Sequence, residues 1–171
     1  MALLSLGKDP NSTSEADVSA ATEQLIAMSK NARFDSETYL RELSAGNLLA
    51  AQAFSSDFVI AKQQTPSLEF VLPAQGAMRW IDCLVIPERA PRPGRAHEFI
   101  SFFLDPANAA VVSAGAKVDT GNTGAFDLIP ADVRNNPVIF PDPQILSGLF
   151  FLKDLGEAEK IYSEAWKRIR G

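Results

Sequence analysis

The spacing of apolar residues near the start of the chain predicts an amphipathic helix. Val18, Ala21, Leu25 and Met28 recur every three or four positions, a period that places them on one face of a helix. Residues 12–14 are hydroxyl residues that suit the N-cap position, because their side chains accept a hydrogen bond from the first turn. A helix therefore begins close to this cluster.

Similar patterns predict helices along the rest of the chain. Asp35 or Ser36 offers a cap for a short helix that Gly46 closes, and a helix from about Asp57 ends before a proline. At Asp105-Pro106, aspartate caps the following helix and proline occupies its first position. The predicted helices cover residues 12–28, 36–45, 57–64, 95–104, 106–114, 130–136, 141–149 and 156–170.

Runs of apolar, β-branched or aromatic residues between these helices predict strands. The runs cover residues 47–54, 68–73 and 77–87, and the last two end at prolines. Alternation of strands and helices predicts an α/β fold in which helices flank a mixed sheet. The pattern leaves the pairing of the strands open.

Composition narrows the classes of function. The chain has 171 residues, of which 46% are hydrophobic and 22% charged, and its formal net charge is -5. This is enough apolar material for a hydrophobic core. The sequence has no block of basic residues, so no nucleic-acid partner is predicted. A single cysteine, Cys83, and a single histidine, His97, predict neither a disulfide nor a metal site. No cofactor is predicted.

The first residues also bear on location. The sequence begins MALLSLGKDP, a short apolar patch without a preceding basic region, and this does not predict a signal peptide. We therefore expect either a cytoplasmic chain or one whose natural beginning lies upstream.

Two aspartates have contexts that suggest a ligand. Asp57 lies at a predicted strand-to-helix turn, where an N-cap role explains it equally well. Asp82 lies beside Trp80 in a predicted buried strand, where an unpaired carboxylate is strongly unfavourable. A strand end that opens onto a cleft resolves this difficulty, because an ammonium group can bind the carboxylate and the face of the tryptophan ring. These residues therefore predict a site for an amine.

A pair of carboxylates can also serve as the acid and base of a hydrolase. The sequence has no nucleophile elbow, no phosphate-binding loop and no His-Glu-x-x-His motif. We therefore predict that the chain is not an enzyme and that it has no catalytic residues.

The stretch RWIDCLVIPERAPRPGRAHEFISFFLDPANAAVVSA resembles the extracytoplasmic solute-binding proteins of polyamine (spermidine/putrescine) ABC transporters. It shares with them a W-x-D-x-L-x-I-P strand, a loop, an A-x-x-F-I-x-F-x-L helix and a D-P-capped helix. FSSDFVIAKQ, NNPVIFPDPQILSGLFFLKDLG and IYSEAWKRIR extend the likeness over nearly the whole chain. The resemblance implies a lobe of the periplasmic-binding-protein type II fold and a periplasmic location.

The resemblance also implies roles for particular residues. Trp80 and Asp82 would line the ligand cleft, Phe54 would stand where the family often has a tryptophan, and Asp57 where putrescine binders use an aspartate. Asn122 would retain the asparagine of the family's Y-x-x-P-N motif and serve as a ligand-binding residue, although the tyrosine position of that motif is Val118. The expected partners are a small polyamine and the membrane subunits of an ABC transporter.

The chain resembles only the second half of these proteins. By the family pattern, residues 1–82 and 118–171 belong to the second lobe, and residues 83–117 return to the first. A segment separated from its sheet exposes apolar surface, so we expect self-association, swapping or local disorder around residues 88–117.

Three function hypotheses follow for this partial, incomplete lobe. The first is binding of a putrescine- or spermidine-like cation for delivery to an importer. The alternative is a structural or interaction module whose lobe has lost its ligand. The third hypothesis is a hydrolase that uses Asp57 and Asp82.

Overall fold

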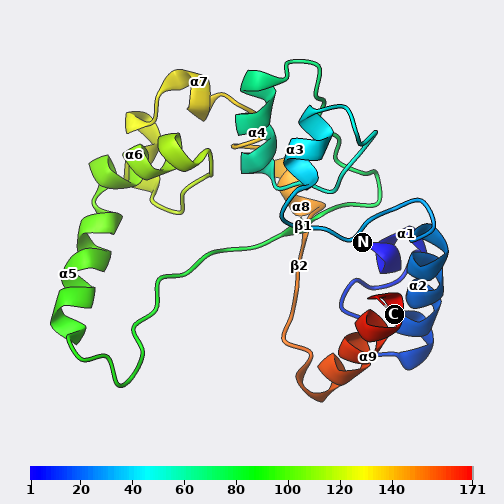
Figure 1. The fold of residues 1–171 in the computed structure, drawn as a ribbon. Coiled ribbons are helices and arrows are strands. Elements are labelled where there is room, and N and C mark those ends of the chain that lie inside the picture. Colours follow the sequence, from blue (N-terminus) through cyan, green and yellow to red (C-terminus); the bar gives the residue numbers. More distant parts are fainter. Residues whose placement is uncertain (171) are drawn as a thin grey trace. The chain divides into compact units, whose positions relative to one another are not determined.

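A computed structural model describes residues 1–170, and they form two compact units (Figure 1). The first unit comprises Met1–Ser36, Val71–Trp80 and the chain from Gln144 onward. The second unit comprises Glu37–Phe70 and Ile81–Pro143. Each unit thus combines segments that are distant in sequence.

The first unit is built on two helices, α2 (Glu15–Met28) and α9 (Glu159–Arg170), which lie side by side (Figure 1). The buried side chains of α2 are Val18, Ala21 and Thr22, and a short N-terminal helix, α1 (Ala2–Ser5), also packs on α2. The prediction of an amphipathic helix near the start of the chain is confirmed, and so is the final helix.

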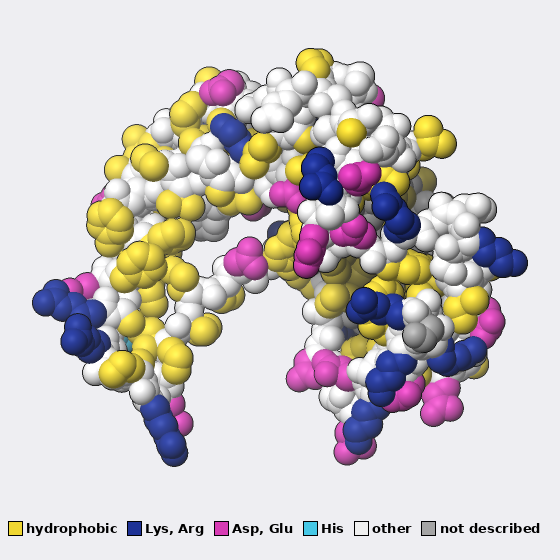
Figure 2. Space-filling view, in the orientation of Figure 1, with side chains coloured by type: hydrophobic (Ala, Val, Ile, Leu, Met, Phe, Trp, Pro, Cys, Tyr) yellow, Lys and Arg dark blue, Asp and Glu magenta, His cyan; other side chains and the backbone are white. Residues whose placement is uncertain are grey.

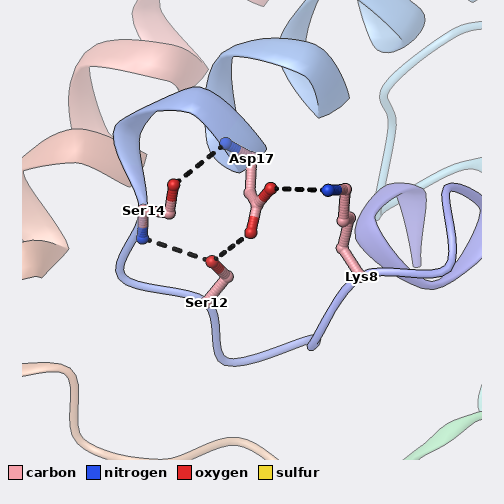
Figure 3. Close-up of polar contacts among 4 residues, drawn as sticks. All are labelled: Lys8, Ser12, Ser14 and Asp17. Carbon is pink, nitrogen blue, oxygen red and sulfur yellow. Dashed lines mark hydrogen bonds and ion pairs between the residues drawn. The ribbon is translucent and has the colours of Figure 1, made fainter.

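A polar cluster at the start of α2 explains why the helix begins there (Figure 3). Ser14 is the N-cap and accepts a hydrogen bond from the backbone N–H of Asp17 at 3.4 Å. The Asp17 carboxylate accepts a hydrogen bond from the Ser12 hydroxyl at 2.8 Å and pairs with the Lys8 ammonium at 3.0 Å. These two partners, Ser12 first, hold the pKa of Asp17 below its ordinary value.

A short parallel strand pair also belongs to the first unit. Strand β1 (Met78–Arg79) pairs with β2 (Phe150–Phe151), with Met78 opposite Phe150. The side chain of Asn11 fixes the chain on both sides of Leu152, because its Nδ2 donates to the Phe151 carbonyl at 3.0 Å and its Oδ1 accepts from the Lys153 N–H at 2.9 Å. These bonds connect the N-terminal loop to β2.

The second unit has its core around α6 (Pro106–Ala116). Buried residues of α6 pack with those of the following 3-10 helix η1 (Thr123–Leu128) and of the segment after it. The core residues are Ala109, Ala110, Ala125, Ile129, Val133 and Ile139. The other helices of this unit are α3 (Tyr39–Ser44), α4 (Ser55–Gln64), α5 (Pro93–Leu104) and α7 (Ala131–Arg134). Two shorter elements follow elsewhere in the chain, α8 (Pro143–Ser147) and η2 (Gly156–Ala158).

The predicted caps are confirmed at α6 and corrected at α3. The Asp105 carboxylate accepts from the N–H groups of Ala107 and Asn108 at 3.0 and 3.2 Å. Helix α3, by contrast, has Thr38 as its N-cap rather than Asp35 or Ser36. Gly46 closes this helix as predicted, and its φ of 78° suits a glycine.

The predicted strands are largely wrong. Residues 47–54 and 68–73 are in no strand, and of residues 77–87 only Met78–Arg79 are. A strand requires a neighbouring strand for its backbone hydrogen bonds, and within residues 1–170 the β1–β2 pair supplies the whole sheet. Most of the residues that were predicted as strands from their apolar composition therefore do not pair with another strand within the described residues.

Helix α5 exposes much of its apolar surface, and hydrophobic side chains gather along it in Figure 2. Phe99, Phe102 and Leu104 are each more than half exposed. In the part of the chain that the structure describes, no single helix has the length and composition of a membrane span, although α5 and α6, bent by 75°, meet those criteria as a pair.

Candidate ligand-binding site

The N-terminus of α4 presents two of the residues that the sequence singled out. Phe54 is the N-cap residue, in an extended conformation, and its side chain is 48% exposed. Asp57 lies in the first turn of the helix and is half-buried. Its negative charge is favourable there because the first turn carries the positive end of the helix dipole. An exposed aromatic ring and an anionic carboxylate thus belong to one turn.

A tyrosine from the neighbouring helix binds this carboxylate. The Tyr39 hydroxyl, at the first residue of α3, donates a hydrogen bond to Oδ2 of Asp57, and α3 packs against α4. Burial, followed by the hydrogen bond to Asp57, raises the pKa of Tyr39 to about 12. The phenol therefore remains a protonated donor at neutral pH. No local sequence pattern connects Tyr39 with Asp57, because the two residues lie 18 positions apart.

Trp80 and Asp82 have different surroundings from those predicted. Trp80 follows β1 in the first unit and is 48% exposed, whereas Asp82 belongs to the second unit. Asp82 is exposed and lies in no strand. The same is true of Ile81 and Val85, which are 70% and 81% exposed. The prediction that Asp82 lies in a buried strand is wrong, so the cost of burying a charge does not arise at this residue.

Asn122 has a structural role in the second unit. Its Oδ1 accepts a hydrogen bond from the Gly124 N–H at 3.1 Å, which caps η1. Its Nδ2 donates to the carbonyl of Leu104, the last residue of α5, at 2.6 Å. Both ends of the side-chain amide are thus engaged in holding η1 to the end of α5.

A hollow of about 220 Å³ lies farther along α4, lined by Phe58, Val59, Lys62, Gln63 and Asn136. The Lys62 ammonium donates to the Leu68 carbonyl at 2.6 Å and to Glu69 at 3.1 Å. A cationic wall is unfavourable for a second cation. The first turn of α4 is therefore the better candidate for an amine.

Comparison with known proteins identifies the class of this fold. A solved structure from Listeria monocytogenes, assigned to a spermidine/putrescine ABC transporter, superposes with a TM-score of 0.87 at 30% identity. The superposition covers 99% of this chain and 52% of that chain. The fold is that of part of an α/β solute-binding protein, as the sequence predicted. The model of the bacterial extracellular solute-binding protein family matches residues 1–141, and the chain belongs to this family.

Two relatives illustrate the similarity. The chain is 30% identical to the putrescine-binding periplasmic protein PotF of Escherichia coli, over 96% of this chain and 47% of that protein. It is 28% identical to spermidine/putrescine-binding periplasmic protein 1 of Haemophilus influenzae, over 99% of this chain and 48% of that protein.

The chain therefore spans about half the length of the curated relatives it matches. The resemblance stated from the sequence is confirmed. The family consists of solute-binding proteins rather than enzymes, as predicted.

Proposed function

We propose that this chain contributes to the binding of a small cationic solute, a putrescine- or spermidine-like polyamine, which the whole protein delivers to an ABC importer. The observation that carries the proposal is the first turn of α4, where the half-exposed Phe54 ring and the Asp57 carboxylate occur together. A carboxylate binds an ammonium by a charge-assisted hydrogen bond, and an aromatic face packs on methylenes or attracts the cation. The names of the matched relatives support the same class of ligand.

The proposal includes the remaining residues that the family resemblance implies. Trp80, Asp82 and Asn122 would take part in binding the ligand in the cleft of the whole protein. Residues 1–82 and 118–171 would form the second lobe, and residues 83–117 would return to the first. A periplasmic location and contact with transporter membrane subunits belong to the same proposal.

Amine binding can be tested by nuclear magnetic resonance titration, which detects weak as well as tight ligands. We expect putrescine and spermidine to shift the amide signals of Phe54 and Asp57, and the neutral diol 1,4-butanediol to leave them unchanged. Asp57→Asn should abolish the shifts, because the amide lacks the charge that pairs with an ammonium. Asp132→Asn is the matched control, since Asp132 also lies in the first turn of a helix.

The same titration on Asp82→Asn tests the second carboxylate. We expect this substitution to weaken the response to spermidine and putrescine while Asp132→Asn does not. Equal shifts with the diamine and the diol, or full shifts in Asp57→Asn, would contradict the proposal.

The alternative function is an interaction module, and the exposed apolar surface of α5 favours it. In that case a protein partner should shift the amide signals of residues along α5, and no amine should shift any amide signal. The absence of any response to amines, together with association through α5, would favour this alternative.

A further inference from the structure

The phenol of Tyr39 connects two parts of the turn that begins α4. Its hydroxyl donates to Oδ2 of Asp57, and a backbone hydrogen bond from Phe54 acts on the same phenol oxygen. Tyr39 is itself half-buried at the first position of α3, a helix that packs on α4. One side chain from a separate helix thus contacts the backbone of Phe54 and the carboxylate of Asp57.

This arrangement has a chemical consequence for the carboxylate. An ionised carboxylate has about four acceptor positions on its two oxygens. The Tyr39 phenol occupies one position on Oδ2 of Asp57. Oδ1 is the second oxygen that can accept a hydrogen bond from a ligand. A carboxylate held in one rotamer loses less conformational entropy when it binds a ligand.

We propose that Tyr39 is a positioning residue, which orients the Asp57 carboxylate for an ammonium group through its hydroxyl hydrogen bond. This inference rests on the proposed function, because it assigns to Tyr39 a part in binding the same cation. Tyr39 acts through Asp57 and need not contact the ligand. Its raised pKa supports this role, since the phenol donates over the whole neutral range.

The test compares the two tyrosines of the chain. Tyr39→Phe keeps the ring and removes the hydroxyl, and we expect it to weaken putrescine binding on the order of tenfold, the size typical of a hydrogen bond to a charged group. Tyr162→Phe is the matched control, because its hydroxyl donates to the Ser12 carbonyl in the first unit at 2.5 Å. It should leave the affinity unchanged. Circular dichroism of both variants checks that the helices are retained.

Two further measurements distinguish positioning from a general structural role. The double variant Tyr39→Phe/Asp57→Asn should bind putrescine no more weakly than Asp57→Asn, because the hydroxyl acts through the carboxylate. In Asp57→Asn, the pKa of Tyr39, followed by the carbon resonance of its phenol, should fall below the value of about 12.

The outcomes separate this inference from the proposed function. Putrescine binding by Tyr39→Phe at the wild-type level, or additive losses in the double variant, would overturn the positioning role alone. Failure of the wild-type protein to bind any diamine would overturn the proposed function and the positioning role together. The titration of Tyr39 would still report whether its hydroxyl is bonded to Asp57.

Discussion

The helix pair of the first unit and helix α5 of the second unit differ in whether the apolar face of the helix is buried. Helices α2 and α9 pack on each other, and Val18 and Ala21 are 4% and 5% exposed. Helix α5 is at least as apolar in sequence, yet Phe99 and Phe102 are 56% and 63% exposed. An apolar stripe therefore predicts that a helix forms, whereas its burial depends on a partner surface.

The two regions also differ in how polar contacts hold them. In the first unit, polar bonds join segments that are distant in sequence: Tyr162 of α9 donates to the Ser12 carbonyl, and Arg168 of α9 pairs with Glu23 of α2 at 2.5 Å. The ion pair of α5, between Arg95 and Glu98 at 2.7 Å, is local to the helix and exposed. Exposed pairs of this kind contribute little to stability.

The largest effect is expected in the core of the second unit. Ile129 is 2% exposed, and Ile129→Ala should lower the free energy of unfolding by about 2 to 4 kcal/mol, because it removes apolar contacts and leaves a cavity. Val111→Ala is the control, since Val111 lies on α6 and is 71% exposed. Urea unfolding measures both, and equal losses would show that burial does not distinguish these sites.

The exposed face of α5 should promote self-association. We expect the wild-type chain to scatter light as a species heavier than the 18.5 kDa monomer, because contiguous exposed apolar surface favours association. The double variant Phe99→Ser/Phe102→Ser should weaken the association on the order of tenfold or more, as two aromatic contacts are lost. Ser101→Ala is the control on the same helix. A wild-type monomer with well-protected amides over residues 88–117 would contradict this prediction.

A smaller effect is expected where the N-terminal loop meets β2. Asn11→Ala removes both of the hydrogen bonds that Asn11 makes around Leu152, and the loss should be about 1 kcal/mol because the residues involved are accessible to water. Hydrogen exchange should increase at the amide of Lys153. The exposed Asn31→Ala serves as the control, and unchanged exchange at Lys153 would refute the role given to Asn11.

The smallest effect is a dependence of stability on pH at the start of α2. The pKa of Asp17 is lower in the folded protein than its ordinary value, so its contribution is present at neutral pH and is lost as the pH falls below about 4. Asp17→Asn should lower the melting temperature at pH 7 and make no difference in strong acid. Glu157→Gln is the control. A constant difference between wild type and Asp17→Asn at all pH values would contradict the linkage.

The starts of α2 and α6 were predictable because their signals are local. Ser14 caps α2, and Asp105 with Pro106 begins α6, through hydrogen bonds and backbone angles that involve only a few neighbouring residues. The strands were not predictable, because the run at residues 77–87 shows only that its residues are apolar. Whether such a run forms a ladder depends on a partner such as β2, about 70 residues away in the chain.

Local sequence patterns and the family resemblance were sufficient to predict the family, most of the helices and the candidate aspartate at the first turn of α4. The packing of the chain, by contrast, sets the exposure of Asp82, the capping of η1 by Asn122 and the hydrogen bond from Tyr39 to Asp57 across 18 positions. The reason is that side-chain hydrogen bonds and burial depend on which segments pack together. Local patterns of apolar and polar residues carry no direct information about contacts between segments distant along the chain.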